Sequence, residues 1–133
     1  MQELEHHFKA LADGTRLRIL NLLLHGELCV CDIQHVLDVT QPNVSRHLAY
    51  LKNASLVRDR RDGFRIFYRL ADPLDGVKQR LYRFLREICA EDDQFNADRN
   101  HLRSVIKAGH CTLSEWKPYS AMAPAQSRLR TAL

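Results

Sequence analysis

Apolar residues recur along the first part of the chain with the spacing of amphipathic helices. Leu4, Phe8 and Leu11 repeat at i, i+4 and i+7, which predicts a short helix ending near residue 12. A second helix is expected over residues 15–24, where the leucines share one face. Asp13 is its expected N-terminal cap, and Gly26 marks its end.

Two further helices are predicted directly after the second. The third is short, starts around Cys29 and Cys31, and carries the apolar positions Val30, Ile33, Val36 and Leu37. Thr40 is the expected cap of the fourth helix. Pro42 is tolerated in its first turn, because the amide that proline lacks has no intrahelical partner there.

The fourth segment, QPNVSRHLAYLKNA, has two distinct faces. Its apolar stripe, which is expected to pack on the domain, consists of Val44, Leu48 and Leu51. Its other face displays hydrogen-bonding groups that match base edges and phosphates. These residues are Asn43, Arg46, His47 and Tyr50, with Gln41 and Ser45 beside them. The alternative interpretation is an ordinary solvated helix face.

After residue 55 the hydrophobic period changes to two. The segments LVRDRR and FRIFYRL flank Asp62-Gly63, which predicts a β-hairpin with a type I′ turn. Three arginines crowd around this turn: Arg60, Arg61 and Arg65. They would repel one another unless an anionic partner such as a DNA backbone meets them. Alternatively, Asp59 and Asp62 neutralise the tip locally.

Together these elements predict a mainly α protein with a small β-hairpin, a winged helix-turn-helix. Residues 1–94 would form the DNA-binding and dimerisation domain, 95–109 an additional C-terminal helix, and 110–133 a loosely ordered tail. Asp72 and Pro73 are expected to open a long fifth helix. Its wide apolar stripe and that of the first helix exceed the needs of a small monomer, which favours a helical homodimer interface.

The charge distribution supports binding to a polyanion. The formal net charge is +4, but residues 1–40 hold three Lys/Arg and six Asp/Glu, whereas residues 41–70 hold seven and two. Positive charge is therefore concentrated on the recognition segment and the hairpin. A basic patch of this kind is the electrostatic footprint of a DNA-binding protein, although chance clustering on a solvated surface gives the same pattern.

Other protein classes fit the sequence poorly. Four cysteines are too few for a disulfide scaffold. The N-terminus has no apolar signal region, and no stretch approaches the ~20 apolar residues of a membrane span. We therefore expect a cytoplasmic protein that is not bound to a membrane. No GxGxxG, P-loop, HExxH or GxSxG motif is present, so the chain is not expected to be an enzyme.

Two segments carry a resemblance to a known family. They are FKALADGTRLRILNLLLHGELCVCDIQHVL and TQPNVSRHLAYLKNASLVRDRRDGFRIFYRL, within residues 3–92. In order and content they resemble the ArsR/SmtB family of metal-responsive repressors, and ELCVCD resembles the box of the arsenic-responsive members. The resemblance implies a homodimer that binds operator DNA and dissociates when a metal or metalloid binds.

Cys29 and Cys31 are the expected ligands of that inducer. Sulfur-only ligation selects soft species, which suits trivalent arsenic or antimony, that is, arsenite or antimonite. On a regular helix, residues i and i+2 point ~200° apart, so binding to both thiolates is expected to distort or unwind the start of the third helix. The helix N-terminus is expected to lower the cysteine pKa, and Asp32 to oppose this. Alternatively, both cysteines are small buried hydrophobes.

The third ligand and the exact inducer stay open. Arsenic-responsive relatives often carry a third cysteine where this chain has Gln34, so Cys89, Cys111 or a small cellular thiol would have to replace it. His35 could offer a nitrogen to zinc. However, residues 75–93 contain none of the histidines of zinc-sensing relatives, and no cysteine precedes residue 29, unlike in cadmium and lead sensors. A DNA-binding thiol redox sensor, in which a distal cysteine forms the disulfide, is the alternative of another class.

Overall fold

The computed structural model describes residues 1–72 and 74–108. Within these residues the chain forms six helices and three strands. In chain order they are α1 Gln2–Leu11, α2 Gly14–Leu23, β1 Leu28–Cys29, α3 Val30–Leu37, α4 Gln41–Asn53, β2 Val57–Asp62, β3 Arg65–Leu70, α5 Gly76–Cys89 and α6 Asp93–Ala108. The predicted mainly α fold with a β-hairpin is confirmed. Pro73, Cys111 and the predicted tail over residues 110–133 lie outside the described residues.

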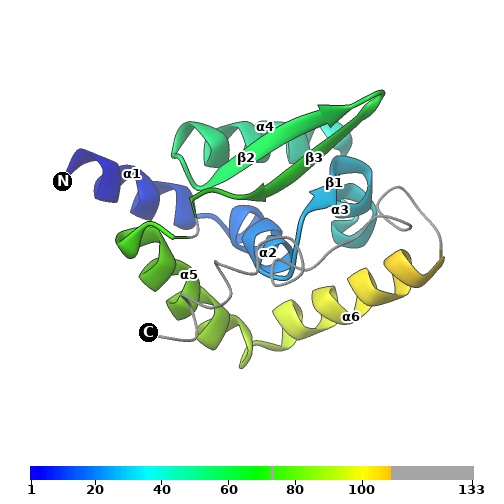
Figure 1. Ribbon diagram of the computed structural model, residues 1–133. Coiled ribbons are helices and arrows are strands. Elements are labelled where there is room, and N and C mark those ends of the chain that lie inside the picture. The colour runs from blue at the N-terminus through cyan, green and yellow to red at the C-terminus, as the bar shows by residue number, and fades with distance from the viewer. Residues whose placement is uncertain (73, 109–133) are drawn as a thin grey trace.

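The three strands form one antiparallel sheet in the order β1-β3-β2. Figure 1 shows the long β2–β3 hairpin in front of α4, with the short β1 beside it. Sequence patterns did not predict β1, because two residues carry no periodicity and their pairing with Phe67 and Tyr68 is long-range. Through this strand, the segment with the cysteines is joined to the hairpin.

The hairpin turn differs from its prediction by one residue. Asp62 pairs with Arg65, so Gly63 and Phe64 form the two-residue loop. Only Gly63 has a positive φ there, at 62°. This is the φ pattern of a type II′ turn, in which glycine takes the first loop position, and not of the predicted type I′ turn.

The buried core explains why the helices take these positions. The predicted apolar stripe of α4, Val44, Leu48 and Leu51, is fully buried and packs with leucines of α2 and with Ile33 of α3. Asp13 caps α2 as predicted, since its carboxylate accepts a hydrogen bond from the Arg16 amide at 3.0 Å. Thr40 takes the cap position of α4, but its side chain makes no capping hydrogen bond.

Helix α5 begins later than predicted. Asp75 is its N-terminal cap, and its carboxylate accepts hydrogen bonds from the amides of Val77 and Lys78. Asp72, the predicted opening residue, has a φ of 43° and binds Arg58 and Lys78 through its carboxylate. The buried hydroxyl of Tyr82 lies 2.9 and 2.8 Å from the carbonyl oxygens of Leu56 and Ala71, which holds α5 against the base of the hairpin.

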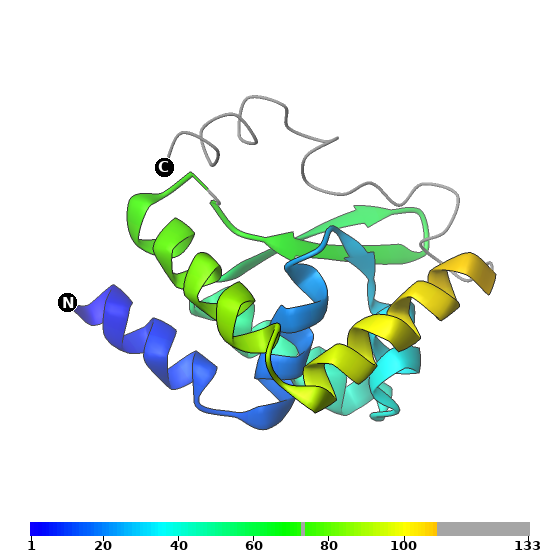
Figure 2. The same cartoon turned by 90° about the horizontal axis from the view of Figure 1, so that it is seen from below.

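Helices α1 and α5 lie side by side at one end of the molecule, as both views show (Figures 1 and 2). The Lys78 ammonium lies 3.7 Å from the Glu3 carboxylate, between the two helices. Their outer surfaces expose large apolar side chains: Leu4, Phe8, Val77, Phe84 and Ile88. We call this set the α1–α5 apolar surface.

Helix α6 packs against α2 and α3. Arg18 binds the buried Asp98 carboxylate through two hydrogen bonds of 2.8 and 2.9 Å. Leu102 and Val105 belong to the same buried cluster as the leucines of α2. Among the described residues, no helix is long and apolar enough to cross a membrane.

Candidate nucleic-acid interface and thiol site

The predicted polar residues of helix α4 differ in how far they are exposed to solvent. Gln41, Asn43, Ser45 and Arg46 are exposed, as expected for side chains that contact a large partner. The Arg46 guanidinium donates a 3.0 Å hydrogen bond to the Asn43 side-chain oxygen, which orients both groups together. These four residues form the first part of the candidate interface.

His47 is not displayed in the same way. Its side chain is only 14% exposed, and its Nδ1 lies 3.8 Å from the Asp13 carboxylate and 3.5 Å from the Arg16 guanidinium. The histidine therefore faces the junction between α1 and α2 as much as solvent. The expectation that His47 is exposed like its neighbours on this face is therefore wrong, because its side chain is mostly buried against Asp13 and Arg16.

Arg16 holds this junction together, and sequence patterns did not single it out. Its guanidinium donates hydrogen bonds to the carbonyl oxygens of Ala10, at 2.7 Å, and Lys9, at 3.1 Å. The same group lies 4.1 Å from the centre of the Tyr50 ring, a cation–π contact. Arg16 thus connects the end of α1 to the polar face of α4.

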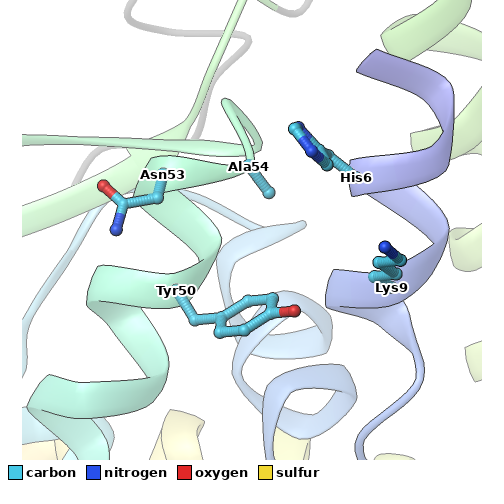
Figure 3. Close-up of a pocket in the computed structure, with 5 residues that line it drawn as sticks. All are labelled: His6, Lys9, Tyr50, Asn53 and Ala54. Atoms are coloured by element: carbon cyan, nitrogen blue, oxygen red, sulfur yellow. The ribbon is translucent and has the colours of Figure 1, made fainter. Parts of the chain in front are cut away.

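A pocket of about 200 Å³ continues this face between α1 and the end of α4. It is lined by His6, Lys9, Tyr50, Asn53 and Ala54 (Figure 3). The Tyr50 hydroxyl points toward Lys9, while His6 lies opposite Ala54. The pocket brings α1 side chains next to α4, which helical periodicity within either segment could not predict.

The three hairpin arginines also differ from one another. Arg61 and Arg65 are exposed beside the tip, and Phe64 is fully exposed at it. In contrast, the Arg60 guanidinium binds the buried Glu27 carboxylate at 2.6 Å and covers the Phe67 ring at 4.4 Å.

The two aspartates expected to neutralise the tip lie in different surroundings. The Asp59 carboxylate pairs with Lys52 at 3.0 Å, away from the tip. The Asp62 carboxylate lies 4.0 Å from Arg60. The carboxylates of Asp59 and Asp62 therefore lie near Lys52 and Arg60. The side chains of Arg61 and Arg65 are exposed.

Cys29 and Cys31 lie at the boundary between β1 and α3. Cys29 is the extended N-cap residue, with φ −72° and ψ 145°, and Cys31 is in the first helical turn. Their sulfur atoms are 3.2 Å apart. Two metal–sulfur bonds of about 2.3 Å that meet at about 90° would span about 3.3 Å. The prediction that the helix must distort or unwind to bring both sulfurs to one ion is therefore wrong, because Cys29 lies outside the helix.

The predicted lowering of the cysteine pKa is also wrong for Cys29. Burial raises the pKa of its thiol, and the nearby Asp32 carboxylate raises it further. Hydrogen bonds from the amides of Cys31 and Asp32, and the charge of Arg65, lower the pKa without outweighing burial. The thiol is only 3% exposed, so desolvation of the thiolate outweighs the favourable helix N-terminus.

Among the described residues, no third protein ligand is assembled around this pair. Across residues 1–72 and 74–108, no group of three or more His, Cys, Asp or Glu side chains could hold a metal ion. Cys89 is buried at the end of α5, and burial raises the pKa of its thiol. Cys89 therefore does not complete the Cys29–Cys31 pair in this arrangement.

Comparisons with known proteins identify the chain's relatives. Residues 13–59 match the family model described as "Bacterial regulatory protein, arsR family". The chain is 54% identical over 101 residues to an arsenical resistance operon repressor of Escherichia coli, covering 75% of this chain and 79% of that protein. It is 52% identical over 64 residues to an arsenic resistance transcriptional regulator of Pseudomonas putida, a match that spans 47% of this chain and only half of that regulator.

Solved structures agree in fold. A homodimeric winged helix-turn-helix DNA-binding domain from Mycobacterium bovis matches with 34% identity and a TM-score of 0.58, over 68% of this chain and 81% of that one. The AntR antimony-specific transcriptional repressor matches with 34% identity and a TM-score of 0.53, over 65% of this chain and 77% of that one.

Proposed function

Because the chain belongs to the arsR family of bacterial transcriptional regulators, a family of DNA-binding proteins and not of enzymes, we propose how this member is switched. It is a homodimeric repressor, and trivalent arsenic or antimony bound at Cys29 and Cys31 releases it from operator DNA. The observation that carries this proposal is the 3.2 Å sulfur pair at the start of α3, the helix that precedes α4.

In this proposal, α4 enters the major groove of the operator. Gln41, Asn43, Ser45 and Arg46 contact base edges, since they are exposed and carry the required donors and acceptors. His47 contributes from a fixed position beside Asp13 and Arg16.

The hairpin acts as the wing. Arg61 and Arg65 contact phosphates, because their charges lie exposed near its tip. Arg60 contributes less, because its charge is already bound to Glu27.

The α1–α5 apolar surface supports the homodimer. Phe8 and Phe84 are 57% and 56% exposed, an unusual position for phenylalanine in a protein that stays monomeric. Burying this surface against the same surface of a second copy would form a two-fold interface. A dimer also places two copies of α4 on the two half-sites of an operator.

Release from DNA follows from the position of the two cysteines. Cys29 is part of the sheet through its pairing with Phe67, and Cys31 belongs to α3. The two sulfurs already have the separation that two bonds to one ion require, so capture needs little movement once Cys31, which is disulfide-bonded in this structure, is reduced. A pyramidal ion needs a third ligand, from Cys111 or a small cellular thiol, and this third bond displaces the start of α3.

The displacement reaches α4 through a short connection. Only three residues separate the two helices, and Asp38, the first of them, has a positive φ of 53°. A connection of this length transmits a shift of α3 to α4. The two copies of α4 then no longer fit successive half-sites of the operator.

The test is a fluorescence-polarisation titration of operator DNA with the full chain. Arsenite or antimonite should release the DNA, whereas cadmium, lead, zinc and hydrogen peroxide should have little effect. Cys29→Ser and Cys31→Ser should each bind DNA normally and resist release, with Cys89→Ser as the matched control that still responds. Release by peroxide alone would favour the redox sensor, and weak DNA binding by both serine variants would indicate a structural role.

A further inference from the structure

Two histidines face each other across the contact between α3 and α6. His35 lies on the exposed side of α3, one helical turn after Cys31, and His101 lies on α6. Their ring centres are 6.1 Å apart and the ring planes are tilted by 54°. Both views show α6 running beside α3 (Figures 1 and 2). Nothing in the proposed repressor mechanism uses this pair.

The hydrogen bonding of His101 leaves one nitrogen available to a metal ion. Its Nδ1 lies 3.1 Å from the carbonyl oxygen of Val36. A carbonyl oxygen only accepts, so Nδ1 carries the proton and donates it, while Nε2 keeps its lone pair. Histidines that bind metals typically donate their other ring N–H to a carbonyl or carboxylate in this way. Since Val36 follows His35 directly, the bond also holds the His101 ring beside its partner.

We propose that His35 and His101 bind one divalent cation of the zinc or nickel type between α3 and α6. Imidazole nitrogens suit these borderline ions, whereas the thiol pair suits softer ones. A metal–nitrogen bond of about 2.1 Å places the ion about 3.2 Å from each ring centre. Two rings at a tetrahedral angle would then be about 5.2 Å apart, roughly 1 Å closer than observed. Rotation of the exposed His35 side chain closes this difference.

The site holds two protein ligands, and water completes the coordination. This agrees with the finding that, in the described part of the chain, no cluster of three or more ligating side chains is present. A bound ion would cross-link α6 to α3 next to the Arg18–Asp98 pair and the buried Leu102. It would therefore stabilise the folded chain by an amount that grows with the logarithm of the ion concentration above the dissociation constant.

The experiment uses the full, tag-free chain with Cys29→Ser and Cys31→Ser, so that the thiol pair cannot contribute. Isothermal titration with Zn²⁺ alone, repeated with Ni²⁺, should show one ion per chain. Replacing His35→Gln or His101→Gln should each weaken binding at least tenfold. His6→Gln, a change at an exposed histidine on α1, is the matched control and should leave the affinity unchanged.

An NMR measurement on the same parent chain keeps the proposal testable if a glutamine variant fails to fold. Zinc should shift the Nε2 signal of His101 and perturb His35, while the Nδ1 proton of His101 persists. Absence of binding by the parent, equal affinities in all variants, or unshifted imidazole signals would each overturn the proposal. None of these results depends on arsenite or on operator release.

Discussion

Replacing Arg16 with alanine should weaken both the fold and the recognition surface. The side chain is 12% exposed and connects two carbonyl oxygens at the end of α1 with the Tyr50 ring on α4. Two hydrogen bonds from a charged donor contribute about 1.5 kcal/mol each at the low end. A partly exposed cation–π contact adds about 0.5 kcal/mol. We therefore expect Arg16→Ala to lower the free energy of unfolding by about 3.5 kcal/mol.

The same change should reduce operator affinity at least tenfold, because Tyr50 and His47 lose the group that fixes them. Arg16→Lys is the informative control. This variant keeps the charge, but a single ammonium cannot both bond the two carbonyl oxygens and stack on the Tyr50 ring. The stability of Arg16→Lys should therefore lie between that of the parent chain and that of Arg16→Ala.

Stability would be measured by urea unfolding at one protein concentration, since dimerisation makes it concentration-dependent. Operator affinity would be measured by fluorescence polarisation. An alanine variant within about 0.5 kcal/mol of the parent and with unchanged affinity would refute the reasoning.

Three further predictions concern the wing, the dimer and acid stability. Arg61→Ala should reduce the slope of log affinity against log salt by about one unit, whereas Arg60→Ala should change it less because Glu27 already binds that charge. Equal slope changes would contradict this distinction. Phe84→Glu should yield monomers in sedimentation experiments, and an intact dimer would place the interface elsewhere. Lys78 and Arg58 hold the pKa of Asp72 below its ordinary value of 3.8, so its ion pairs stabilise the fold above that pH and are lost as the pH falls through the lower folded value. Asp72→Asn should therefore unfold more easily at about pH 7, by less than about 1 kcal/mol, and match the parent at about pH 2. If Asp72→Asn is still less stable than the parent in acid, the effect comes from backbone conformation and not from the ion pairs.

Local patterns predicted the elements that depend on local chemistry. The stripe of Val44, Leu48 and Leu51 repeats within one helix, and Asp13 caps the helix that begins at the next residue by accepting from an amide only three residues away. The sequence also predicts more apolar surface on the first and fifth helices than a small monomer needs, and Phe8 and Phe84 are exposed on α1 and α5. Periodicity and capping are properties of neighbouring residues, so a single sequence contains them.

Features that depend on distant contacts escaped prediction. Strand β1 has only two residues and exists through its pairing with β3. Arg16 looks like an ordinary charge on α2 until α1 and α4 fold around it. Glu27 similarly gives no sign in the sequence that it will bind Arg60 from the wing.

The Cys29–Cys31 pair combines one feature that the local sequence predicted with two that depend on distant contacts. Its position at the start of α3 was correct, but its geometry and acidity were not. The i, i+2 argument assumed that both residues are helical, whereas Cys29 is extended. The helix N-terminus argument assumed solvent access, whereas burial in the sheet controls the pKa of that thiol. Both errors arise from β1, which local patterns do not reveal.

The most direct test of the switch is the affinity of arsenite for the protein with and without operator DNA. Binding free energies are reciprocal, so the factor by which arsenite weakens operator binding must equal the factor by which operator DNA weakens arsenite binding. We predict a matched weakening of at least tenfold in both titrations, abolished in Cys31→Ser. Equal arsenite affinities for the free and DNA-bound dimer would contradict the account.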